Sequence, residues 1–361
     1  MVSSMSSKIR VLVVDDSAVA RSVIIKGLTG HPRIEVVGYA INAVDARSKV
    51  RLLSPDVMTL DVEMPGTNGI DFLKQFLPTH PLPVILVSSL NLRVFDALEA
   101  GAVDFVRKPD GVESRESFIN SLASKIIVAS HARVRGAAPK GEAAPSPAAS
   151  RPAAPSPVVP QLLGRSGTDL DSTIIGLGAS TGGTEATLTV LKQLPADIPG
   201  MLIVQHMPTG FTKMYADRLN RLCQMEVREA KHGDEIHRGL ALIAPADLQM
   251  RVVRMGSRYT VSCQPGEKVS GHRPSVDALF TSMASQVKCR MVGIIMTGMG
   301  RDGASGLLEM RKAGAYTIGQ DKDSCVVYGM PMVAHDIGAV AVQASCENIA
   351  GVLMTHLKSK N

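Results

Sequence analysis

Residues 136–160, GAAPKGEAAPSPAASRPAAPSPVVP, constrain the fold of this chain more than any other stretch. Seven of these residues are proline, eight are alanine and only three are charged. Such a segment has too little apolar surface to offset the entropy of ordering it in a core. Proline also favours an extended chain that spans up to ~3.1 Å per residue. We therefore expect a flexible Pro/Ala-rich linker at residues 131–170, between an N-terminal domain (1–130) and a C-terminal domain (171–361).

The composition outside this segment is that of ordinary globular domains and excludes several classes of function. The net charge of +6 is thinly spread, and no Lys/Arg run is interleaved with aromatic residues, so we expect no nucleic-acid partner. No apolar stretch approaches the roughly 18 residues that a membrane span needs, so we expect no membrane insertion. The five cysteines lack disulfide or metal spacing, which predicts reduced thiols and a cytoplasmic location.

The N-terminal domain alternates apolar runs with helical patterns. Continuous Val, Ile and Leu indicate strands that are buried on both faces of a parallel sheet. Helical segments such as 17–28 and 93–101 fall between the runs, so five strand–helix units predict a small doubly wound α/β domain. The predicted strands are IRVLVVDD (9–16), IEVVGYA (34–40), DVMTLDV (56–62), LPVILVSS (82–89) and AVDFVRKP (102–109).

Three carboxylates follow two of these predicted strands. Asp15 and Asp16 end the first, and Asp61 ends the third. Strand ends of a doubly wound sheet meet in one crevice, where three carboxylates repel one another unless a divalent cation lies among them. Oxygen-only ligands suit Mg²⁺. The alternative is that Asp15 and Asp16 only cap the helix that follows.

Two further polar residues are predicted at the same rim. Ser88 ends the fourth strand, and Lys108 follows the fifth. A hydroxyl and an ammonium group can both bind phosphoryl oxygens, and a carboxylate would be the nucleophile of an aspartyl phosphate. This order of residues predicts phosphoryl chemistry in the N-terminal domain.

The order DD…D…S…K-P over residues 8–128 resembles the receiver domain of two-component response regulators. The resemblance implies a flavodoxin-like (βα)5 fold, and it implies Asp61 as a phosphoacceptor that a sensor histidine kinase charges. It also implies Mg²⁺ held by Asp15, Asp16 and Asp61. Ser88 and Lys108 would form the switch pair. Phe105 takes the place of the aromatic switch residue, unless it is a plain core residue.

The C-terminal domain shows the same alternation of apolar runs with helical patterns. Buried-strand runs occupy 172–180, 199–207 and 289–300, and residues 241–263 have the pattern of short antiparallel strands with turns. We predict a doubly wound, mainly parallel α/β domain with a β-hairpin insertion.

The loop after the first of these runs reads IIGLGASTGGT (174–184). A dinucleotide fingerprint needs a glycine at residue 181, which is threonine, and the lysine of a P-loop is absent. An atypical anion site at the following helix remains open. The segment GASTG matches G-x-S-x-G, a tight strand-to-helix turn that presents a serine nucleophile. A purely structural glycine-rich turn is the alternative reading.

A serine nucleophile needs a base and an orienting group. His206 ends the second run, and Asp302 follows the third, so parallel neighbouring strands would bring both to Ser180. His206 would accept the Ser180 proton and Asp302 would orient the imidazole. A loop histidine and a helix-capping aspartate are the alternatives. Candidate oxyanion donors lie in the turn at residues 181–183 and in the loop at 299–300.

The segments GASTGG, QHMP, SGHRPSVDALF, TGMGRDGA and QDKDSCVVYGMP together resemble the chemotaxis protein-glutamate methylesterase family. The resemblance covers residues 172–357. It implies an esterase that hydrolyses glutamate γ-methyl esters on the cytoplasmic helices of chemoreceptors, and it implies deamidation of receptor glutamines as a second activity. The triad maps onto Ser180, His206 and Asp302, with Thr181, Gly182 and Met299 beside it and no cofactor. The segment APADLQM (244–250) departs from the family because it lacks the histidine often present there.

The regulatory expectation follows from the two resemblances. An unphosphorylated receiver would cover the crevice of Ser180, and charging Asp61 would release it. A non-catalytic response regulator, whose second domain binds a nucleotide or a protein, is the alternative function. A general lipase or peptidase is disfavoured because the order Ser…His…Asp differs from that of α/β-hydrolases.

Overall fold

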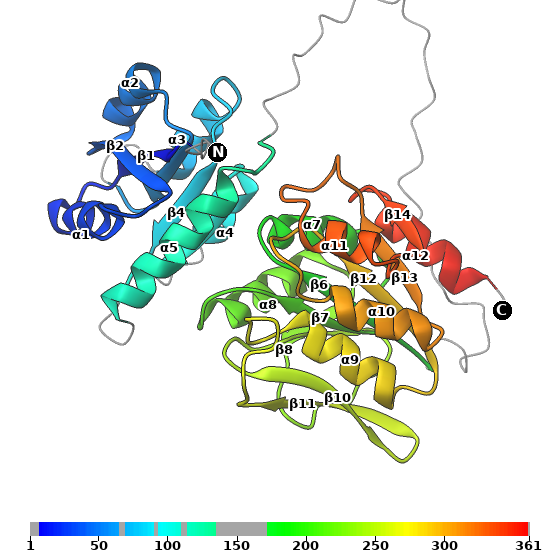
Figure 1. Cartoon of the computed structure of the whole chain (residues 1–361). Helices are drawn as coiled ribbons and strands as arrows, with labels where there is room; N and C mark the ends of the chain where they lie inside the picture. Colours follow the sequence, from blue (N-terminus) through cyan, green and yellow to red (C-terminus); the bar gives the residue numbers. More distant parts are fainter. Residues whose placement is uncertain (1–6, 65–68, 90–92, 110–113, 135–171, 360–361) are drawn as a thin grey trace, which may run out of the picture.

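Two separate β-sheets organise the chain in a computed structural model (Figure 1). The structure describes residues 7–64, 69–89, 93–109, 114–134 and 172–359. The predicted linker therefore lies outside the described residues, except for 131–134. Among those four residues, Arg133 contacts the second sheet's domain, because it donates its backbone N–H to the Val326 carbonyl at 3.0 Å.

The first sheet has five parallel strands in the order β2-β1-β3-β4-β5. This is the flavodoxin-like order of a doubly wound sheet, so the predicted (βα)5 fold is confirmed. The strands are β1 (Ile9–Val14), β2 (Ile34–Ala40), β3 (Val57–Asp61), β4 (Val84–Ser88) and β5 (Asp104–Arg107). The helices are α1 (Ala18–Leu28), α2 (Ala43–Leu53), α3 (Gly69–Phe76), α4 (Arg93–Glu99) and α5 (Arg115–Ala129).

Helices cover both faces of this sheet because successive strand residues point to opposite sides. Val11 and Val13 pack with α1 and α5, whereas Leu12 and Val14 pack with α2, α3 and α4. Burial on both faces explains the continuous apolar runs of the sequence.

The second sheet has seven strands in the order β14-β13-β12-β6-β7-β9-β8, and every pairing is parallel. Helices α7, α8 and α12 share one apolar cluster with one face, and α9, α10 and α11 lie in another cluster on the opposite face. The strands are β6 (Thr173–Ala179), β7 (Gly200–Gln205), β8 (Glu226–Glu229), β9 (Leu240–Ile243), β12 (Arg290–Ile295), β13 (Tyr316–Gln320) and β14 (Val342–Ala344). The helices are α7 (Gly183–Leu191), α8 (Phe211–Leu222), α9 (Val276–Gln286), α10 (Ala304–Lys312), α11 (Met330–Asp336) and α12 (Ile349–Lys358).

The predicted hairpin insertion is confirmed for only part of its segment. β10 (Gln249–Met255) and β11 (Arg258–Gln264) form an antiparallel pair apart from the main sheet. The first part of the segment belongs instead to β9, which pairs in parallel with β7 and β8. The expectation of antiparallel strands from residue 241 was therefore wrong, since β9 completes the buried sheet.

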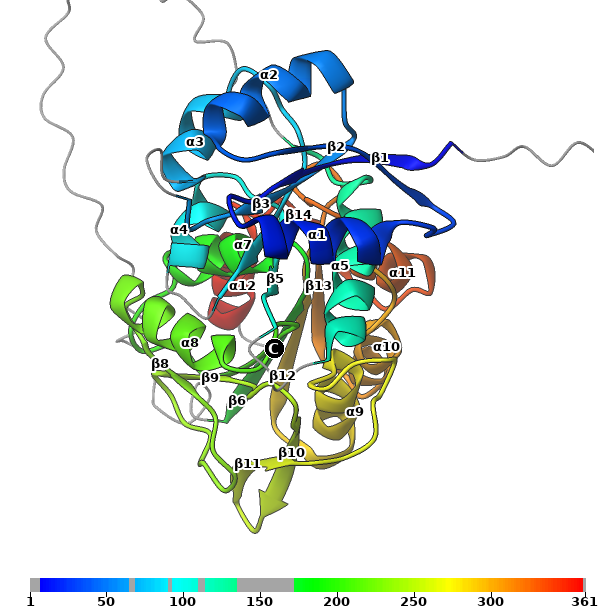
Figure 2. The ribbon, with the colours of Figure 1, turned by 90° about the vertical axis from the view of Figure 1, so that its left-hand side faces the viewer.

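The two sheets' domains share one continuous apolar cluster, and both views place them in contact (Figures 1 and 2). Phe105 of β5 packs on Phe211 of α8 with ring centroids 4.6 Å apart, and Phe95 of α4 stacks on Tyr215 at 5.8 Å. All four aromatic rings are buried. Side chains on both sides of the boundary thus form part of a single core.

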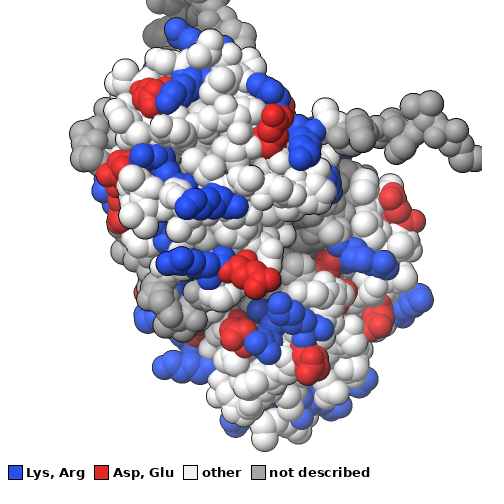
Figure 3. All heavy atoms as spheres, turned by 60° about the vertical axis from the view of Figure 1, so that its left-hand side comes forward, with Lys and Arg blue, Asp and Glu red and all other residues white. Residues whose placement is uncertain are grey.

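The surface carries charges of both signs. On the face drawn in Figure 3, Lys and Arg alternate with Asp and Glu, and neither sign forms a broad patch. Among the described helices, none combines the length and the apolar character that a bilayer crossing requires.

Candidate active site and phosphoacceptor pocket

The predicted triad residues lie at the carboxyl ends of three adjacent strands. β6 pairs with β12 on one side and with β7 on the other. Ser180 directly follows β6, His206 directly follows β7, and Asp302 lies in the loop between β12 and α10. The sheet changes its direction of winding between β6 and β12, and ligands of open α/β sheets bind at such a switch point.

A network of backbone and amide groups fixes the turn of Ser180. The Ser180 N–H donates to the Thr297 carbonyl at 2.9 Å. The buried Gln205 donates its Nε2 to the carbonyls of Ser180 (2.8 Å) and His206 (3.2 Å). One side chain therefore binds the backbone of both the serine and the histidine.

The glycines around Ser180 serve two different purposes. Gly182 has φ +77°, in the left-handed region where a side chain is strained. A Cβ at Gly178 would lie 2.2 Å from Cγ1 of Val276, and one at Gly176 would lie 2.7 Å from the sulfur of Met283. Gly176 and Gly178 therefore let α9 approach β6, and only the later glycine shapes the turn itself.

His206 and Asp302 form a buried hydrogen-bonded pair. His206 Nε2 lies 2.8 Å from Asp302 Oδ2, and the carboxyl group is 1% exposed. Nδ1 of the same imidazole is buried and has no hydrogen-bond partner among the described residues. Nδ1 is thus the ring atom available to a hydroxyl or a substrate.

The amino end of α9 holds the Asp302 carboxylate. Asp302 Oδ1 accepts from Ser275 Oγ (2.7 Å) and from the Asp277 N–H (2.9 Å), and Oδ2 accepts from the Val276 N–H (2.8 Å). Burial raises the pKa of Asp302, but the His206 pair and these donors outweigh it, so that the pKa lies below its usual value. Asp302 is therefore a fixed carboxylate.

A second imidazole covers the ring of His206. His272 stacks on it with centroids 3.9 Å apart and an interplanar angle of 10°. Burial, and after it the adjacent His206, lower the pKa of His272 to about 4. His272 is therefore neutral at neutral pH and can cover the base without adding positive charge.

The residues predicted to surround the triad have distinct positions. Thr181 is buried, and its Oγ1 donates to Asp104 Oδ2 at 2.6 Å across the domain boundary. The Gly183 N–H donates to the Ser180 carbonyl at 2.7 Å, so Thr181 and Gly182 provide the other N–H groups of the predicted turn. Met299 lies in an exposed loop position, 43% accessible.

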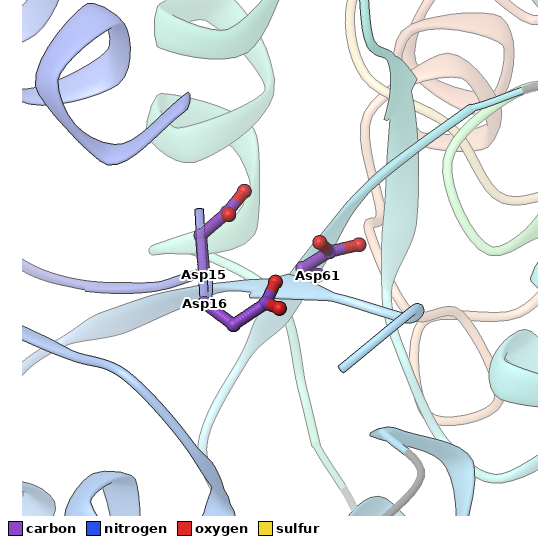
Figure 4. Close-up of side chains that lie close together, drawn as sticks. All are labelled: Asp15, Asp16 and Asp61. Carbon is purple, nitrogen blue, oxygen red and sulfur yellow. The ribbon is translucent and has the colours of Figure 1, made fainter. Parts of the chain in front are cut away.

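The three predicted aspartates lie together at the ends of β1 and β3 (Figure 4). One ligand atom from each of Asp15, Asp16 and Asp61 lies within 4.8 Å of the others. Lys108 Nζ lies 2.6 Å from Asp61 Oδ2 and 3.0 Å from Asp15 Oδ2. Burial lowers the pKa of Lys108, but its contacts with Asp61 and Asp15 outweigh this and raise the pKa above its usual value.

The predicted switch residues flank this pocket. Ser88 ends β4 and is 0% exposed, and its Oγ has no hydrogen-bond partner among the described residues. Phe105 lies on β5 against the second domain, so it is both a core residue and an interface residue.

Sequence reasoning missed three residues that shape the active site, namely Gln205, His272 and Ser275. A serine before the helical pattern VDALF indicates an N-cap, but nothing local predicts that the cap also donates to Asp302. The contacts of Gln205 and His272 depend on the order of the strands and on the path of a loop.

Comparison with known proteins agrees with this architecture. The CheB methylesterase family matches residues 175–353, and the response regulator receiver domain family matches residues 11–117. A protein-glutamate methylesterase/protein-glutamine glutaminase 2 from Syntrophomonas wolfei is 50% identical over 340 residues, which cover 93% of this chain and 94% of the relative. A protein-glutamate methylesterase/protein-glutamine glutaminase from Syntrophotalea carbinolica is 46% identical over 352 residues, 96% of this chain and 97% of the relative. The crystal structure of the Thermotoga maritima CheB methylesterase catalytic domain is 32% identical, with a TM-score of 0.50 over 51% of this chain and 97% of that one.

Proposed function

Because the chain belongs to the protein-glutamate methylesterase/protein-glutamine glutaminase family, we propose that it hydrolyses glutamate γ-methyl esters, and deamidates glutamines, on the cytoplasmic helices of chemoreceptors. The observation that carries the proposal is the buried His206–Asp302 pair at the strand end beside Ser180, with Nδ1 of the imidazole unpartnered.

In the proposed reaction His206 accepts the Ser180 proton at Nδ1, and Ser180 Oγ attacks the ester carbonyl. Asp302 keeps the other proton on Nε2 and stabilises the positive imidazolium. N–H groups of Thr181 and Gly182, and the loop of Met299, are the proposed oxyanion donors. Methanol leaves with the proton from His206, and water then hydrolyses the acyl-serine, which restores free Ser180 and yields a glutamate carboxylate. A glutamine follows the same steps and releases ammonia.

The N-terminal domain carries the proposed phosphoacceptor, Asp61, which a sensor histidine kinase would charge. The all-oxygen donors of Asp15, Asp16 and Asp61 fit Mg²⁺, which when bound would neutralise charge on the phosphoryl group. Lys108 would bind a phosphoryl oxygen, since its ammonium group already contacts the carboxylate of Asp61. Ser88 would use its unpartnered hydroxyl in the same way.

Contacts across the domain boundary support regulation of the esterase by the receiver. Asp104 binds Thr181, the neighbour of Ser180, and Phe105 packs on Phe211. Arg107 donates to the Thr209 carbonyl at 3.3 Å, in the loop that follows His206. We therefore propose that the unphosphorylated receiver restrains both loops of the active site, and that phosphorylation of Asp61 releases them.

Methanol release from methylated chemoreceptor membranes tests the esterase. We expect activity from the full chain and at least about a 10³-fold loss in Ser180→Ala with an unchanged circular dichroism spectrum. Retained turnover in Ser180→Ala would remove the triad assignment. Binding of ATP or NAD in calorimetry, without esterase activity, would favour a non-catalytic regulator instead.

Acetyl phosphate with Mg²⁺ tests the regulation. We expect it to stimulate methanol release by the wild type and to have no effect on Asp61→Asn. Stimulation that survives in Asp61→Asn would contradict the gating role of Asp61, while leaving the triad assignment untouched.

A further inference from the structure

A single buried amide, Gln249, holds the loop that supplies two contacts of the proposed base pair. Gln249 is the first residue of β10 and is 0% exposed. Its Nε2 donates to the carbonyls of Glu267 and His272, both at 3.0 Å, and its Oε1 accepts from the Ser275 N–H at 3.0 Å. The carboxamide therefore binds the loop at its start, its middle and its end.

Two residues of this loop, His272 and Ser275, contact the base pair of His206 and Asp302. His272 stacks on the His206 ring, and Ser275 donates its hydroxyl to Asp302 Oδ1. Gln249 touches neither member of the base pair in the hydrogen bonds described, but it fixes the backbone of the residues that do.

Replacing a buried amide that makes these hydrogen bonds lowers the stability of the protein, and the part of the chain that it orders is this loop. Without Gln249 the Glu267 carbonyl and the Ser275 N–H would lose the partner described here, and the His272 carbonyl would keep only the Val269 N–H, which would destabilise the loop if these groups stayed buried. The loop would avoid that cost by moving outward toward water, which would remove His272 from the imidazole face. The ion pair between Arg273 and Asp247 restrains the loop less than Gln249 does, because the Asp247 side chain is 63% exposed.

We propose that Gln249 is a positioning residue of the esterase, whose buried carboxamide holds His272 against His206 and Ser275 against Asp302. This inference rests on the proposed function, because it assigns a role toward the same base. An amide supplies the two donors and the acceptor that the loop uses here, and these groups do not change their protonation with pH.

The test measures kcat and KM for methanol release by the full chain with Gln249→Met, which keeps the volume and removes all three hydrogen bonds. We expect kcat to fall about 10- to 100-fold, since a small misplacement of a catalytic group has effects of this size, and KM to change less than about twofold. Val252→Ala, on the same strand, is the matched control: it destabilises the hairpin core without touching the loop, and its kcat should equal that of the wild type.

A double-mutant cycle decides whether Gln249 acts through His272. We expect the kcat of Gln249→Met/His272→Ala to be no lower than that of the less active single variant, because both substitutions remove the contact of His272 with His206. The proposal would be overturned if the two substitutions multiplied their effects on kcat in the cycle. It would also be overturned if Val252→Ala, at an equal thermal destabilisation, lost as much kcat as Gln249→Met.

Gln249→Glu keeps the shape and the acceptor for the Ser275 N–H and removes only the donor, so it provides the same test if Gln249→Met does not fold. An unchanged kcat in a folded Gln249→Glu enzyme would overturn the role of the His272 bond. The wild type in the same assay, with Ser180→Ala as the background, separates the two hypotheses. An inactive wild type contradicts the proposed function, whereas an active wild type with an unaffected Gln249 variant contradicts this inference alone.

Discussion

Asp302 accepts four hydrogen bonds, two at each carboxylate oxygen, and every donor is fixed by the backbone or by a buried side chain. An aspartate in this setting cannot rotate without losing several bonds at once. The imidazole that it binds therefore has a defined orientation before any substrate arrives, which is the form of electrostatic preorganisation that serine hydrolases use.

We predict that Asp302→Asn lowers kcat by about 10³- to 10⁴-fold. The new amide NH₂ would face N–H donors of α9 and would favour the wrong tautomer of His206. Steady-state methanol release measures the effect, with Asp336→Asn, at an exposed site of α11, as the control. A loss of less than tenfold would contradict the orienting role of Asp302.

The neutral His272 predicts a dependence of stability on pH. The pKa of His272 is about 4 in the folded protein against 6.5 ordinarily, so between these values the unfolded chain binds the proton more readily. Stability should therefore fall as the pH drops through this range, by about 1–2 kcal/mol from this group between pH 7 and pH 5. Urea unfolding at pH 7 and pH 5 should show a smaller difference in His272→Phe, which keeps a stacked ring. Equal differences in both proteins would be evidence against a buried neutral imidazole.

Only some of the residues of this site could be predicted from the sequence. Ser180, His206 and Asp302 were predictable because each follows a recognisable buried strand, and strand ends converge by rule. Gln205, Gln249 and His272 were not, because a buried amide or a second imidazole has no local signature. Their roles depend on which backbone groups the folded loops leave unpaired.

At the scale of elements, helix α9 connects the sheet to the Asp302 carboxylate. Its amino end donates to Asp302, and its side chains Val276 and Met283 fill the space that Gly178 and Gly176 leave open on β6. The distance between α9 and β6 therefore sets the position of Asp302.

We predict that Gly178→Ala lowers both stability and activity. The added Cβ would lie 2.2 Å from Val276 Cγ1, so α9 must shift, at a cost of about 1–3 kcal/mol. Gly351→Ala is the matched control, since a Cβ at this exposed position of helix α12 meets nothing within 4 Å, and it should be neutral or stabilising by up to ~1 kcal/mol. Thermal unfolding and kcat are the measurements. Equal behaviour of the two alanine variants would contradict the packing argument.

Strands were predictable where the length of an apolar run and the turns on either side of it both indicated a strand. The five strands of the first sheet and β6, β7 and β12 of the second follow their apolar runs closely. β9 was assigned to the wrong pairing because four apolar residues, Leu240–Ile243, do not reveal whether a strand joins a parallel sheet or a hairpin. The neighbouring β7 decides this, and a single run carries no information about its neighbour.

At the scale of the whole molecule, the domain boundary carries the contacts that we propose to be regulatory. Asp104 accepts from Lys125 Nζ (2.5 Å) within the receiver and from Thr181 Oγ1 (2.6 Å) across the boundary. Asp104 precedes Phe105 on β5, so a movement of this strand changes the polar and the aromatic contact together.

We predict that Asp104→Ala raises methanol release in the absence of acetyl phosphate, by about 2- to 10-fold if the lost bond is worth about 0.5–1.5 kcal/mol. The remaining stimulation by acetyl phosphate should be correspondingly smaller. Glu35→Ala, an exposed position on edge strand β2, controls for the loss of an acidic residue in the receiver. Unchanged basal activity in Asp104→Ala would contradict a restraining role for this contact.

In the proposed regulation, the packing of Phe105 on Phe211 would set how far phosphorylation must shift the population of released molecules. Separating the two rings exposes apolar side chains worth about 1.5–3 kcal/mol each, which holds the resting protein almost entirely in the joined state. Moving a two-state equilibrium from 1:99 to 99:1 takes about 5.5 kcal/mol. In the proposed regulation, a phosphoryl group on Asp61 would have to offset this difference, and we expect a graded response in which only a fraction of the charged molecules is released at any moment.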